Sequence, residues 1–520
     1  MGKNQTVKQI DVMIRACVPV IAIQSAEEQR VISEVVLLAE KQKKRVMTWS
    51  AAIGFQQISP ELGPFEKSPD PVASLVRVIT EAQAEPPIQT IWIFNDLHQF
   101  MKNPVVMRAV RDVSHALRKV KGVTAILLGS SITVNPDARK DVLTVDFPLP
   151  VAEDLEEQLD TFISKLDSRV KVLLNGGRQE LIHALQGLTK TEADHVLSQA
   201  VVTYSKLDER AIQFVMKMKA QIIKESGALE YFAQKANYSD IGGLDLLKNW
   251  ARQAEASTSD AARAFGVEAP KAALLVGVPG CGKSLTAKAI AGPNRPLVRL
   301  DIGALFGSLV GQSEAQTRGA LKIVEAIGRC VLWIDEIEKG LGGSGGQGDN
   351  GVSDKVLATI LTWMQESKSD VFVIATANNI GGMRPELIRR FPVKFFVDLP
   401  QDSERRDIFA IHIAKRNRNP DAYDLDVLVK ATRGFTGSEI EEVVQGGLMA
   451  AFSQGKDEVE TSDFVDVIAQ TVPLSTTMVE GIDEMRRWAS RARPASSNQD
   501  SGHKAAKFDD SSSASYLELS

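Results

Sequence analysis

Eight consecutive residues near the middle of the chain have the types and the spacing of a phosphate-binding loop. They fit the pattern G-x-x-x-x-G-K-S and are Gly277, Val278, Pro279, Gly280, Cys281, Gly282, Lys283 and Ser284. The apolar run ALLV precedes them and the helix-like stretch SLTAKAIAG follows them, which is the context that the pattern requires. Glycines let backbone N–H groups converge on phosphates, the lysine supplies a positive charge and the serine can bind Mg²⁺. We therefore predict that these residues, with Leu285 in the following helix, bind the phosphates of Mg-ATP.

Two carboxylates and an amide follow later apolar runs. The run CVLWI ends in Asp335 and Glu336, which places both acids at the carboxyl edge of a sheet, where open α/β folds bind ligands. We expect Asp335 to hold the hydration shell of Mg²⁺ and Glu336 to polarise the water that attacks the γ-phosphate. The run VFVIATA ends in Asn378, whose amide can bridge the γ-phosphate and that water. Together with the phosphate loop, these residues predict ATP hydrolysis.

Apolar runs that alternate with helix-like stretches must position these groups, and they predict a parallel α/β sheet. In the C-terminal half the runs are ALLVG (273–277), PLVRLD (296–301), CVLWID (330–335), VFVIAT (371–376) and KFFVDLP (394–400). The N-terminal half repeats the series as VIAIQ (20–24), RVMTWS (45–50), TIWIFND (90–96), VTAILLGS (123–130) and LTVDFPLP (143–150). The helical sequels also correspond, because GLTKTEADHVLSQAV (187–201) parallels GFTGSEIEEVVQGGL (434–448). We infer an internal duplication; the alternative is that any two α/β units share such a rhythm.

The two halves differ in the turn that follows the first predicted strand. In the N-terminal half it reads Gln24-Ser25-Ala26-Glu27-Glu28, without glycines to open the backbone and without a lysine to meet phosphate. We therefore expect that the first copy does not bind ATP in this manner.

From Tyr238-Ser-Asp-Ile-Gly-Gly243 through the IDE, ATAN and GFTGSEIE elements, the chain resembles the AAA family over residues 236–475. With its degenerate first half and the closing stretch VPLSTTMVEGIDEMRRWASRARPAS, it looks most like the poorly characterised AAA proteins encoded by a conserved open reading frame of plastids and cyanobacteria. The resemblance implies a ring-forming, hexameric ATPase. It also implies that Asp240, Ile241 and Gly242 lie near the adenine, and that Gly437 and Ser438 face the nucleotide from a helical lid.

An arginine from the neighbouring subunit stabilises the transferring phosphate in such rings. The family pattern is roughly L-L-R-x-G-R-F-D, whereas this chain has Leu-Ile-Arg389-Arg390-Phe391-Pro392, two residues shorter and without the acid after the phenylalanine. Aligning the Arg-Phe pair makes Arg390 the expected finger and Arg389 the second choice. The alternative is that either arginine is a surface charge.

Two further loops have weaker signals. Ring remodellers place an aromatic residue before an aliphatic one and glycine in a pore loop, and here Leu309-Val310-Gly311 loses the flat aromatic surface. These residues either grip a polypeptide or pack against a neighbouring subunit. The glycine-rich stretch 341–351 is either a second pore-facing or nucleotide-sensing loop or a simple connection. Cys281 lies in the phosphate loop, where oxidation would block ATP, although its position in the motif accepts almost any residue.

Composition limits the remaining classes of function. The chain has 520 residues, 44% of them hydrophobic and 24% charged, and a formal net charge of −5. This balance lacks the basic footprint of a nucleic-acid-binding protein, so that partner is unsupported. Three cysteines without CxxC spacing argue against disulfides and zinc, and no run reaches about 18 apolar residues. We expect no membrane segment and a cytoplasmic location, or the plastid stroma if the gene is plastid-encoded.

We therefore expect an α/β fold in which a three-layer P-loop NTPase sheet of the AAA+ type with a helical lid follows a degenerate AAA-like half without a P-loop. The expected parts are the degenerate α/β domain at 1–150, a helical lid-like segment and linker at 151–235, the ATPase core at 236–400, the lid at 401–475 and a C-terminal segment at 476–520, disordered from about Arg493.

The leading hypothesis for the function is an ATP-driven machine that remodels or regulates a protein partner. A nucleotide-gated switch or scaffold with slow turnover is the alternative, and a nucleic-acid remodeller is a third. HExxH is absent from the sequence, so no fused metalloprotease of that type follows the motor.

Overall fold

A computed structural model of the chain describes residues 3–497, with gaps at 86, 131, 133, 135–137, 168–169, 175, 226, 233–236, 292–294, 307–311, 342–349, 368 and 382. The chain divides into two compact units, one of residues 1–219 with 322–328 and one of residues 220–321 with 329–520. The division lies within the helix α8 (Glu209–Glu225) rather than near residue 235, and the five-part division stays a proposal. Among the described residues, no helix is long and apolar enough to cross a membrane.

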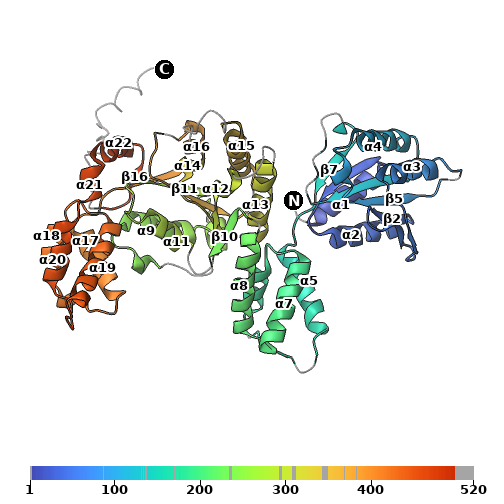
Figure 1. Cartoon of the computed structure of the whole chain (residues 1–520). Coiled ribbons are helices and arrows are strands. Elements are labelled where there is room, and N and C mark those ends of the chain that lie inside the picture. Colours follow the sequence, from blue (N-terminus) through green and yellow to red (C-terminus); the bar gives the residue numbers. More distant parts are fainter. Residues whose placement is uncertain are drawn as a thin grey trace, which may run out of the picture. The chain divides into compact units, whose positions relative to one another are not determined.

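The first unit is built on a seven-stranded sheet with the order β4-β3-β2-β5-β6-β1-β7 (Figure 1). The strands are β1 (Val20–Gln24), β2 (Arg45–Ser50), β3 (Gly54–Ser59), β4 (Phe65–Glu66), β5 (Thr90–Asn95), β6 (Thr124–Gly129) and β7 (Leu143–Asp146). The five from β2 to β7 pair in parallel, and β3 and β4 extend one edge as antiparallel strands. The central parallel strands β1, β5 and β6 are buried on both faces, which explains their nearly continuous apolar runs.

Helices cover both faces of this sheet and give three layers. On one face lie α3 (Pro71–Ala82) and α4 (Pro104–Leu117), which share a core with Trp49 and Phe94. The other core includes residues of α1 (Lys3–Arg15) and α2 (Glu28–Lys41). A helical segment follows: α5 (Ala152–Ser164), α6 (Arg178–Leu185), α7 (Lys190–Tyr204) and α8, with the short strands β8 (Lys171–Val172) and β9 (Lys206–Leu207).

The second unit repeats the architecture with the order β10-β12-β13-β14-β11-β15-β16. Its strands are β10 (Leu229–Phe232), β11 (Ala272–Gly277), β12 (Leu297–Leu300), β13 (Val331–Ile334), β14 (Phe372–Ala377), β15 (Val393–Val397) and β16 (Arg493–Pro494). Its core helices are α9 (Asp245–Ala256), α10 (Asp260–Ala264), α11 (Lys283–Ile290), α12 (Ile302–Phe306), α13 (Gln312–Ile327, as far as Leu321), α14 (Ile337–Leu341), α15 (Asn350–Glu366) and α16 (Pro385–Arg389). All of its strand pairs are parallel except β10 with β12.

The strand orders of the two units correspond one to one. The first unit has β2-β5-β6-β1-β7 and the second has β12-β13-β14-β11-β15, so each chain segment takes the same place in its sheet. This order confirms the predicted fold class, in which an α/β half of the same kind but without a P-loop precedes the P-loop half.

The lid is a separate helical bundle that packs around its own core. It comprises α17 (Asp402–Ala414), α18 (Leu425–Ala431), α19 (Gly437–Ser453) and α20 (Thr461–Gln470), and its core contains Phe409, Phe435 and Phe464. After α21 (Leu474–Thr477) and α22 (Val479–Ala489), the chain returns to the sheet as β16, beside β15. The expectation of disorder from about Arg493 is therefore wrong for Arg493–Ser497, because β16 pairs with β15 and Ala495 is fully buried.

The candidate pore residues Leu309, Val310 and Gly311 lie outside the described residues, as does most of the glycine-rich stretch 341–351.

Candidate nucleotide-binding site

The phosphate loop joins β11 to α11 through backbone conformations that favour glycine. Gly277, Gly280 and Gly282 have φ angles of +153°, +76° and +85°. A Cβ atom at Gly277 would lie 1.9 Å from the carbonyl oxygen of Val397, so a side chain cannot fit there. The loop wraps the start of α11, whose N-terminus offers a partial positive charge to an anion.

Lys283 brings a positive charge into this loop. Its side chain is almost fully buried, and Nζ donates to the carbonyl oxygens of Gly277 at 2.7 Å and Val278 at 2.8 Å. Burial lowers the pKa of Lys283 to about 8. A buried ammonium whose hydrogen-bond partners are neutral carbonyls fits a phosphate ligand, because the anion would compensate the charge.

Oxygen atoms suited to Mg²⁺ converge beside the loop. Ser284 Oγ donates to Asp335 Oδ1 at 3.1 Å, and Thr376 Oγ1 donates to the same oxygen at 2.5 Å. A carboxylate and hydroxyl groups are hard oxygen ligands of the kind that Mg²⁺ takes. The residues therefore fit the predicted metal, with Ser284 and Asp335 as the groups that would hold it and Thr376 as a neighbour that sequence reasoning missed.

Glu336 is fixed by its backbone and by both carboxylate oxygens. Its φ of +46° is uncommon for a residue with a side chain, and its N–H donates to Thr376 Oγ1 at 3.1 Å. Oε1 accepts a hydrogen bond from Asn378 Nδ2 at 2.9 Å, and Oε2 forms an ion pair with Lys339 Nζ at 2.7 Å. The predicted base and the predicted polar relay are thus brought into direct contact.

Glu338 contacts Asn378 and so helps to position the Glu336–Asn378 pair. Its Oε1 accepts a hydrogen bond from the backbone N–H of Asn378 at 2.9 Å, and burial raises the pKa of its carboxyl group. Glu338 therefore holds Asn378, which in turn holds Glu336. The sequence carried a signal for Glu338, since it is an acid only two residues after Glu336, at the start of α14.

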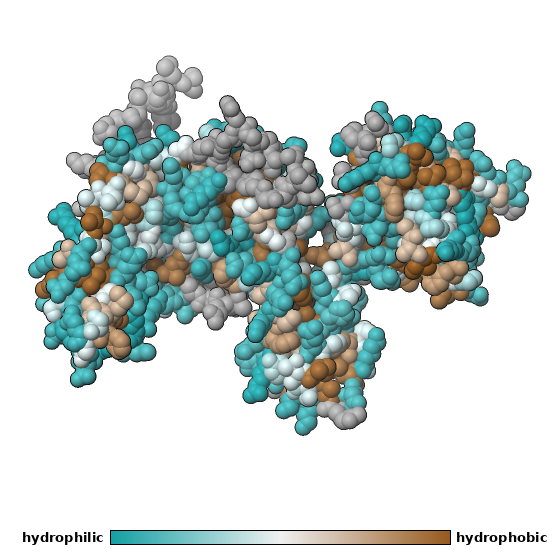
Figure 2. Space-filling view, viewed as in Figure 1, coloured by the Kyte–Doolittle hydropathy of each residue, from teal (hydrophilic) through white to brown (hydrophobic). Residues whose placement is uncertain are grey.

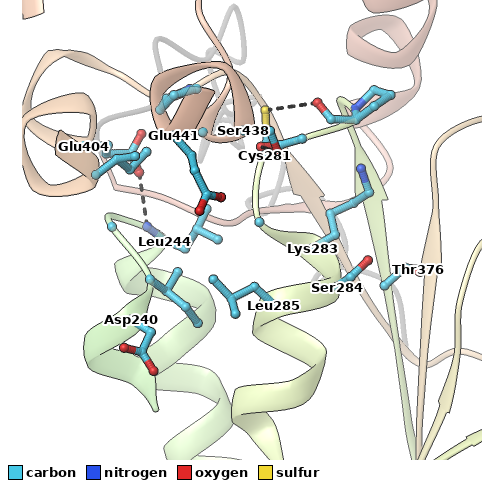
Figure 3. Close-up of a pocket in the computed structure, with 18 of the residues that line it drawn as sticks. Asp240, Leu244, Cys281, Lys283, Ser284, Leu285, Thr376, Glu404, Ser438 and Glu441 are labelled. Carbon is cyan, nitrogen blue, oxygen red and sulfur yellow. Dashed lines mark hydrogen bonds between the residues drawn. The ribbon is translucent and has the colours of Figure 1, made fainter. Parts of the chain in front are cut away.

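A pocket of about 500 Å³ collects these groups at the carboxyl edge of the sheet (Figure 3). The predicted site residues that line it are Asp240, Ile241, Gly242, Pro279, Gly280, Cys281, Gly282, Lys283, Ser284, Leu285, Asp335, Glu336, Asn378, Gly437 and Ser438. The lining residues that sequence reasoning missed are Leu244, Thr376, Asp398, Pro400, Glu404, Ile408, Ile411, His412 and Glu441. The pocket is thus closed by the loop before α9, by the phosphate loop and by two lid helices.

The end of the pocket away from the phosphate loop is apolar with a few polar groups. Gly242 approaches Ile408 of α17 so closely that a Cβ would lie 2.5 Å from Ile408 Cγ1. His412 of the same helix lies with Nδ1 3.5 Å from Glu441 Oε1, and burial lowers its pKa, which favours the neutral imidazole. A flat, apolar base with hydrogen-bonding edges fits such surroundings.

The comparisons with known proteins agree with this geometry. Residues 273–399 match the ATPase family associated with various cellular activities (AAA), and residues 422–466 match the AAA+ lid domain. Residues 6–147 and 153–226 match the N-terminal and second domains of SpoVK-like AAA ATPases. An uncharacterised AAA domain-containing protein (ycf46) of Guillardia theta is 34% identical over 94% of this chain and 95% of its own length. The chain belongs to the AAA ATPase family.

Other relatives of this AAA ATPase divide into two kinds. The ycf46 protein of Pyropia yezoensis is 34% identical over 94% of this chain and 99% of its own length. The ATP-dependent zinc metalloprotease FtsH of Thermotoga maritima is 29% identical over only 49% of this chain and 42% of its own length. The first kind therefore aligns with nearly the whole chain, and the second with about half of it.

The lid of the AAA ATPase touches the phosphate loop directly. Ser438 donates to the carbonyl oxygen of Gly280 through its backbone N–H at 3.0 Å and through Oγ at 3.3 Å. Thr436 caps α19 and forms a capping box with Glu439, which fixes the start of the helix at the loop. A ligand on the loop would therefore meet the lid.

Cys281 is a buried part of the loop wall. Burial raises the pKa of its thiol to about 12, so the reactive thiolate is disfavoured at neutral pH. The geometry thus favours the structural interpretation of Cys281 over control by oxidation.

The two candidate finger arginines lie away from this pocket. Arg390 lines a separate cavity of about 30 Å³ with Lys271 and Val371, at the amino edge of the sheet. Arg389 and Arg390 are exposed, and neither forms an ion pair with another described residue. The chain's own nucleotide pocket opens at the opposite, carboxyl edge, and neither arginine lines it.

Proposed function

We propose that the second unit hydrolyses ATP to ADP and phosphate. The observation that carries this proposal is the pocket in which the buried ammonium of Lys283 and the hydrogen-bonded pair Glu336 and Asn378 share one wall. Lys283 and the N–H groups of the phosphate loop would bind the β- and γ-phosphates, and Ser284 and Asp335 would hold Mg²⁺. The metal would supply charge stabilisation to the phosphate oxygens.

The residues of the chain have distinct tasks in the reaction. Glu336 accepts a proton from the attacking water through a carboxylate oxygen. Asn378 orients that carboxylate and the water, since its Nδ2 already lies 2.9 Å from Glu336 Oε1. Lys283 stabilises the charge that spreads over the phosphate oxygens in the transition state. Asp240, Ile241, Gly242 and Leu285 contact the nucleoside, and Gly437 and Ser438 carry the nucleotide state to the lid.

Hydrolysis by this proposal requires assembly, in a ring of six copies. Arg390 and, second, Arg389 are exposed at the sheet edge opposite the pocket, which suits a finger that acts on a neighbouring subunit. Apolar side chains are also exposed over the lid, where brown surface is visible in Figure 2. Met449 and Phe452, three residues apart on α19, are 68% and 84% exposed. Large apolar side chains of this kind mark interaction surfaces.

The work of the ring is the remodelling or regulation of a protein partner. The absence of a basic footprint in the composition disfavours nucleic acid. One contact favours the second candidate, a switch with slow turnover: Lys339 pairs with Glu336 Oε2 and occupies an oxygen that the reaction needs. The partner and the compartment stay predictions.

The decisive experiment uses the Glu336→Gln variant of the full chain. We expect it to bind ATP with the affinity of the natural protein and to lose at least about 100-fold in phosphate release. Lys283→Ala should instead lose ATP binding. Glu458→Gln, which changes an exposed glutamate of the lid, is the matched control and should behave like the natural protein.

Hydrolysis that persists in Glu336→Gln would refute the assignment of the base. The same variant, loaded with ATP, should retain a protein partner, and recovery of nothing but the chain itself would favour the switch. Stimulation by DNA would favour the nucleic-acid remodeller.

A further inference from the structure

The first unit keeps the chain path of a nucleotide site but not its phosphate loop. Between β1 and α2 the turn has three residues, Ser25, Ala26 and Glu27, whereas five residues, Val278–Gly282, separate β11 from α11. The helices that follow later still correspond: Thr189 caps α7 with Glu192 in a capping box, as Thr436 and Glu439 do for α19. The shorter turn leaves no loop that could cradle phosphates.

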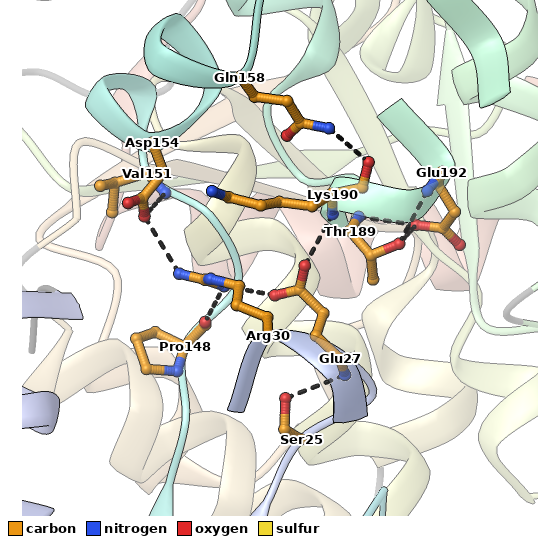
Figure 4. Close-up of polar contacts among 10 residues, drawn as sticks. All are labelled: Ser25, Glu27, Arg30, Pro148, Val151, Asp154, Gln158, Thr189, Lys190 and Glu192. Carbon is orange, nitrogen blue, oxygen red and sulfur yellow. Dashed lines mark hydrogen bonds and ion pairs between the residues drawn. The ribbon is translucent and has the colours of Figure 1, made fainter. Parts of the chain in front are cut away.

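A protein carboxylate takes the place that the loop leaves. Glu27 Oε1 accepts a hydrogen bond from the backbone N–H of Lys190, the first residue of α7, at 2.7 Å (Figure 4). This contact corresponds to the one in the second unit, where Ser438 in the first turn of α19 donates to Gly280 of the phosphate loop. In the first unit the turn therefore reaches the helical segment with its own negative charge.

Arg30 completes the cluster and ties it to a second helix. Its Nη1 contacts Glu27 Oε2 and donates to the carbonyl oxygen of Pro148 at 2.9 Å. Its Nη2 forms an ion pair with Asp154 Oδ2 of α5 at 3.1 Å. Figure 4 shows the guanidinium between the two carboxylates, with Glu27 reaching toward Lys190. The core helix α2 is thus joined to α5 through Arg30 and to α7 through Glu27.

The cluster is deeply buried, and its one positive charge lies between two negative charges. The side chains of Glu27, Arg30 and Asp154 are 4%, 6% and 7% exposed. One guanidinium faces two carboxylates, and each carboxylate also accepts a backbone N–H at a helix start, from Lys190 and from Val151 at 3.3 Å. Such N–H groups carry partial positive charge, which stabilises the second carboxylate. A buried charge cluster with this many partners holds one geometry and penalises every other.

We propose that the Glu27–Arg30–Asp154 cluster replaces a nucleotide in the first unit. It latches the helical segment 152–204 to the α/β core, and it does so whether or not ATP is present. In the second unit the corresponding junction, between Ser438 and the carbonyl oxygen of Gly280, is made by neutral groups beside the nucleotide pocket; in the first unit the chain supplies an anion itself. The first unit is therefore a fixed platform, and the ATP-dependent movement belongs to the second unit alone.

Hydrogen exchange of the full chain tests the latch. The readout is the amide of Lys190 and the first turn of α7, with and without Mg-ATP. In the natural protein we expect this exchange to be the same in both states. In Glu27→Gln and in Arg30→Met it should be faster by about tenfold or more, while the amides of β1 and β6 keep their protection and show that the sheet is folded.

A matched control and an internal control separate the possible failures. Arg178→Met removes exposed ion pairs with Glu156 and Asp160 on the same helical segment and should leave α7 unchanged. The start of α19 should respond to ATP; if it does not, ATP binding in the second unit is what fails, and the comparison of variants still decides the latch. Unchanged exchange at α7 in both cluster variants would overturn the proposal. So would an ATP-dependent change at α7 in the natural protein, or a second ATP bound per chain.

Discussion

The pKa of Lys283 predicts how ATP affinity depends on pH. Burial lowers the pKa of this side chain to about 8 in the free protein, from an ordinary value of 10.5. At pH 7 about 90% of the molecules therefore carry the ammonium, and at pH 9 only about 10% do. The triphosphate favours the charged form, so binding raises the pKa and takes up a proton.

The size of the change in ATP affinity follows from the lowered pKa of Lys283 alone. Between pH 7 and pH 9 the affinity for Mg-ATP should fall about tenfold, and ATP binding at pH 9 should take up about 0.9 proton per chain. Isothermal titration calorimetry in two buffers with different ionisation enthalpies measures both quantities. Lys283→Arg is the control, because its cation does not titrate in this range. Equal affinity at pH 7 and pH 9, or the same proton uptake in the arginine variant, would refute the reasoning.

The stability of the ATP-free protein should change in the opposite direction. The pKa of Lys283 is lower in the folded state than in the unfolded chain, so the unfolded chain binds more protons between about pH 8 and pH 10.5. The contribution of this group to the free energy of unfolding therefore rises with pH across that range. The same buried charge that weakens the empty protein at neutral pH is the one that the phosphates compensate.

Three substitutions test other parts of the site. Gly277→Ala should abolish ATP binding and lower the unfolding temperature of the second unit in calorimetry, because the new Cβ would lie 1.9 Å from a carbonyl oxygen. Lys339→Met should raise steady-state phosphate release severalfold, since it frees Glu336 Oε2. Arg390→Ala should keep ATP affinity but lose about 1,000-fold in hydrolysis, and mixing it with Lys283→Ala subunits should restore part of the activity.

Each of these predictions has a clear contrary result. Normal ATP binding by Gly277→Ala would contradict the close approach of the loop to β15. Lys430→Met changes an exposed lysine of the lid and is the control for Lys339→Met; equal rates in the two variants would mean that Lys339 does not restrain the base. Failure of the mixed subunits to recover activity would argue against a finger that acts between copies.

The sequence predicted those parts of the site that are contiguous in the chain. The phosphate loop, the acidic pair and Asn378 each follow a strand directly, and parallel strands bring their carboxyl ends to one edge. His412 belongs to a lid helix without a motif, and Glu441 ends the GFTGSEIE element, in which only Gly437 and Ser438 were predicted site residues. Only the folding of the lid over the loop brings His412 and Glu441 to the pocket. Their positions therefore depend on tertiary packing, which the local pattern does not encode.

The same difference between local motifs and tertiary packing explains what the sequence did not predict in the first unit and at the C-terminal strand. The sequence of the first unit predicted the loss of a phosphate loop, but not the contact that Glu27 makes with the backbone of Lys190, because these two residues are far apart in the chain. The strand β16 was missed because it has two residues, one of them a proline, and pairs only at an edge. Contacts with distant parts of the chain hold this segment in place. Ala495 is buried, and Ser497 donates its N–H to Asp245 Oδ1 at 2.9 Å.

The pairing of β16 with β15 also bears on how the protein avoids aggregation. Strand β15 has the sequence VKFFV, and without β16 the backbone groups on its outer side would lie at an open edge. An apolar edge strand with free N–H and C=O groups is a template for pairing with another chain. A chain cut after residue 492 should therefore form sheet-like aggregates on warming, while the intact chain stays dispersed. In this interpretation, β16 completes the sheet of the second unit and also protects the edge of β15 from pairing with another chain.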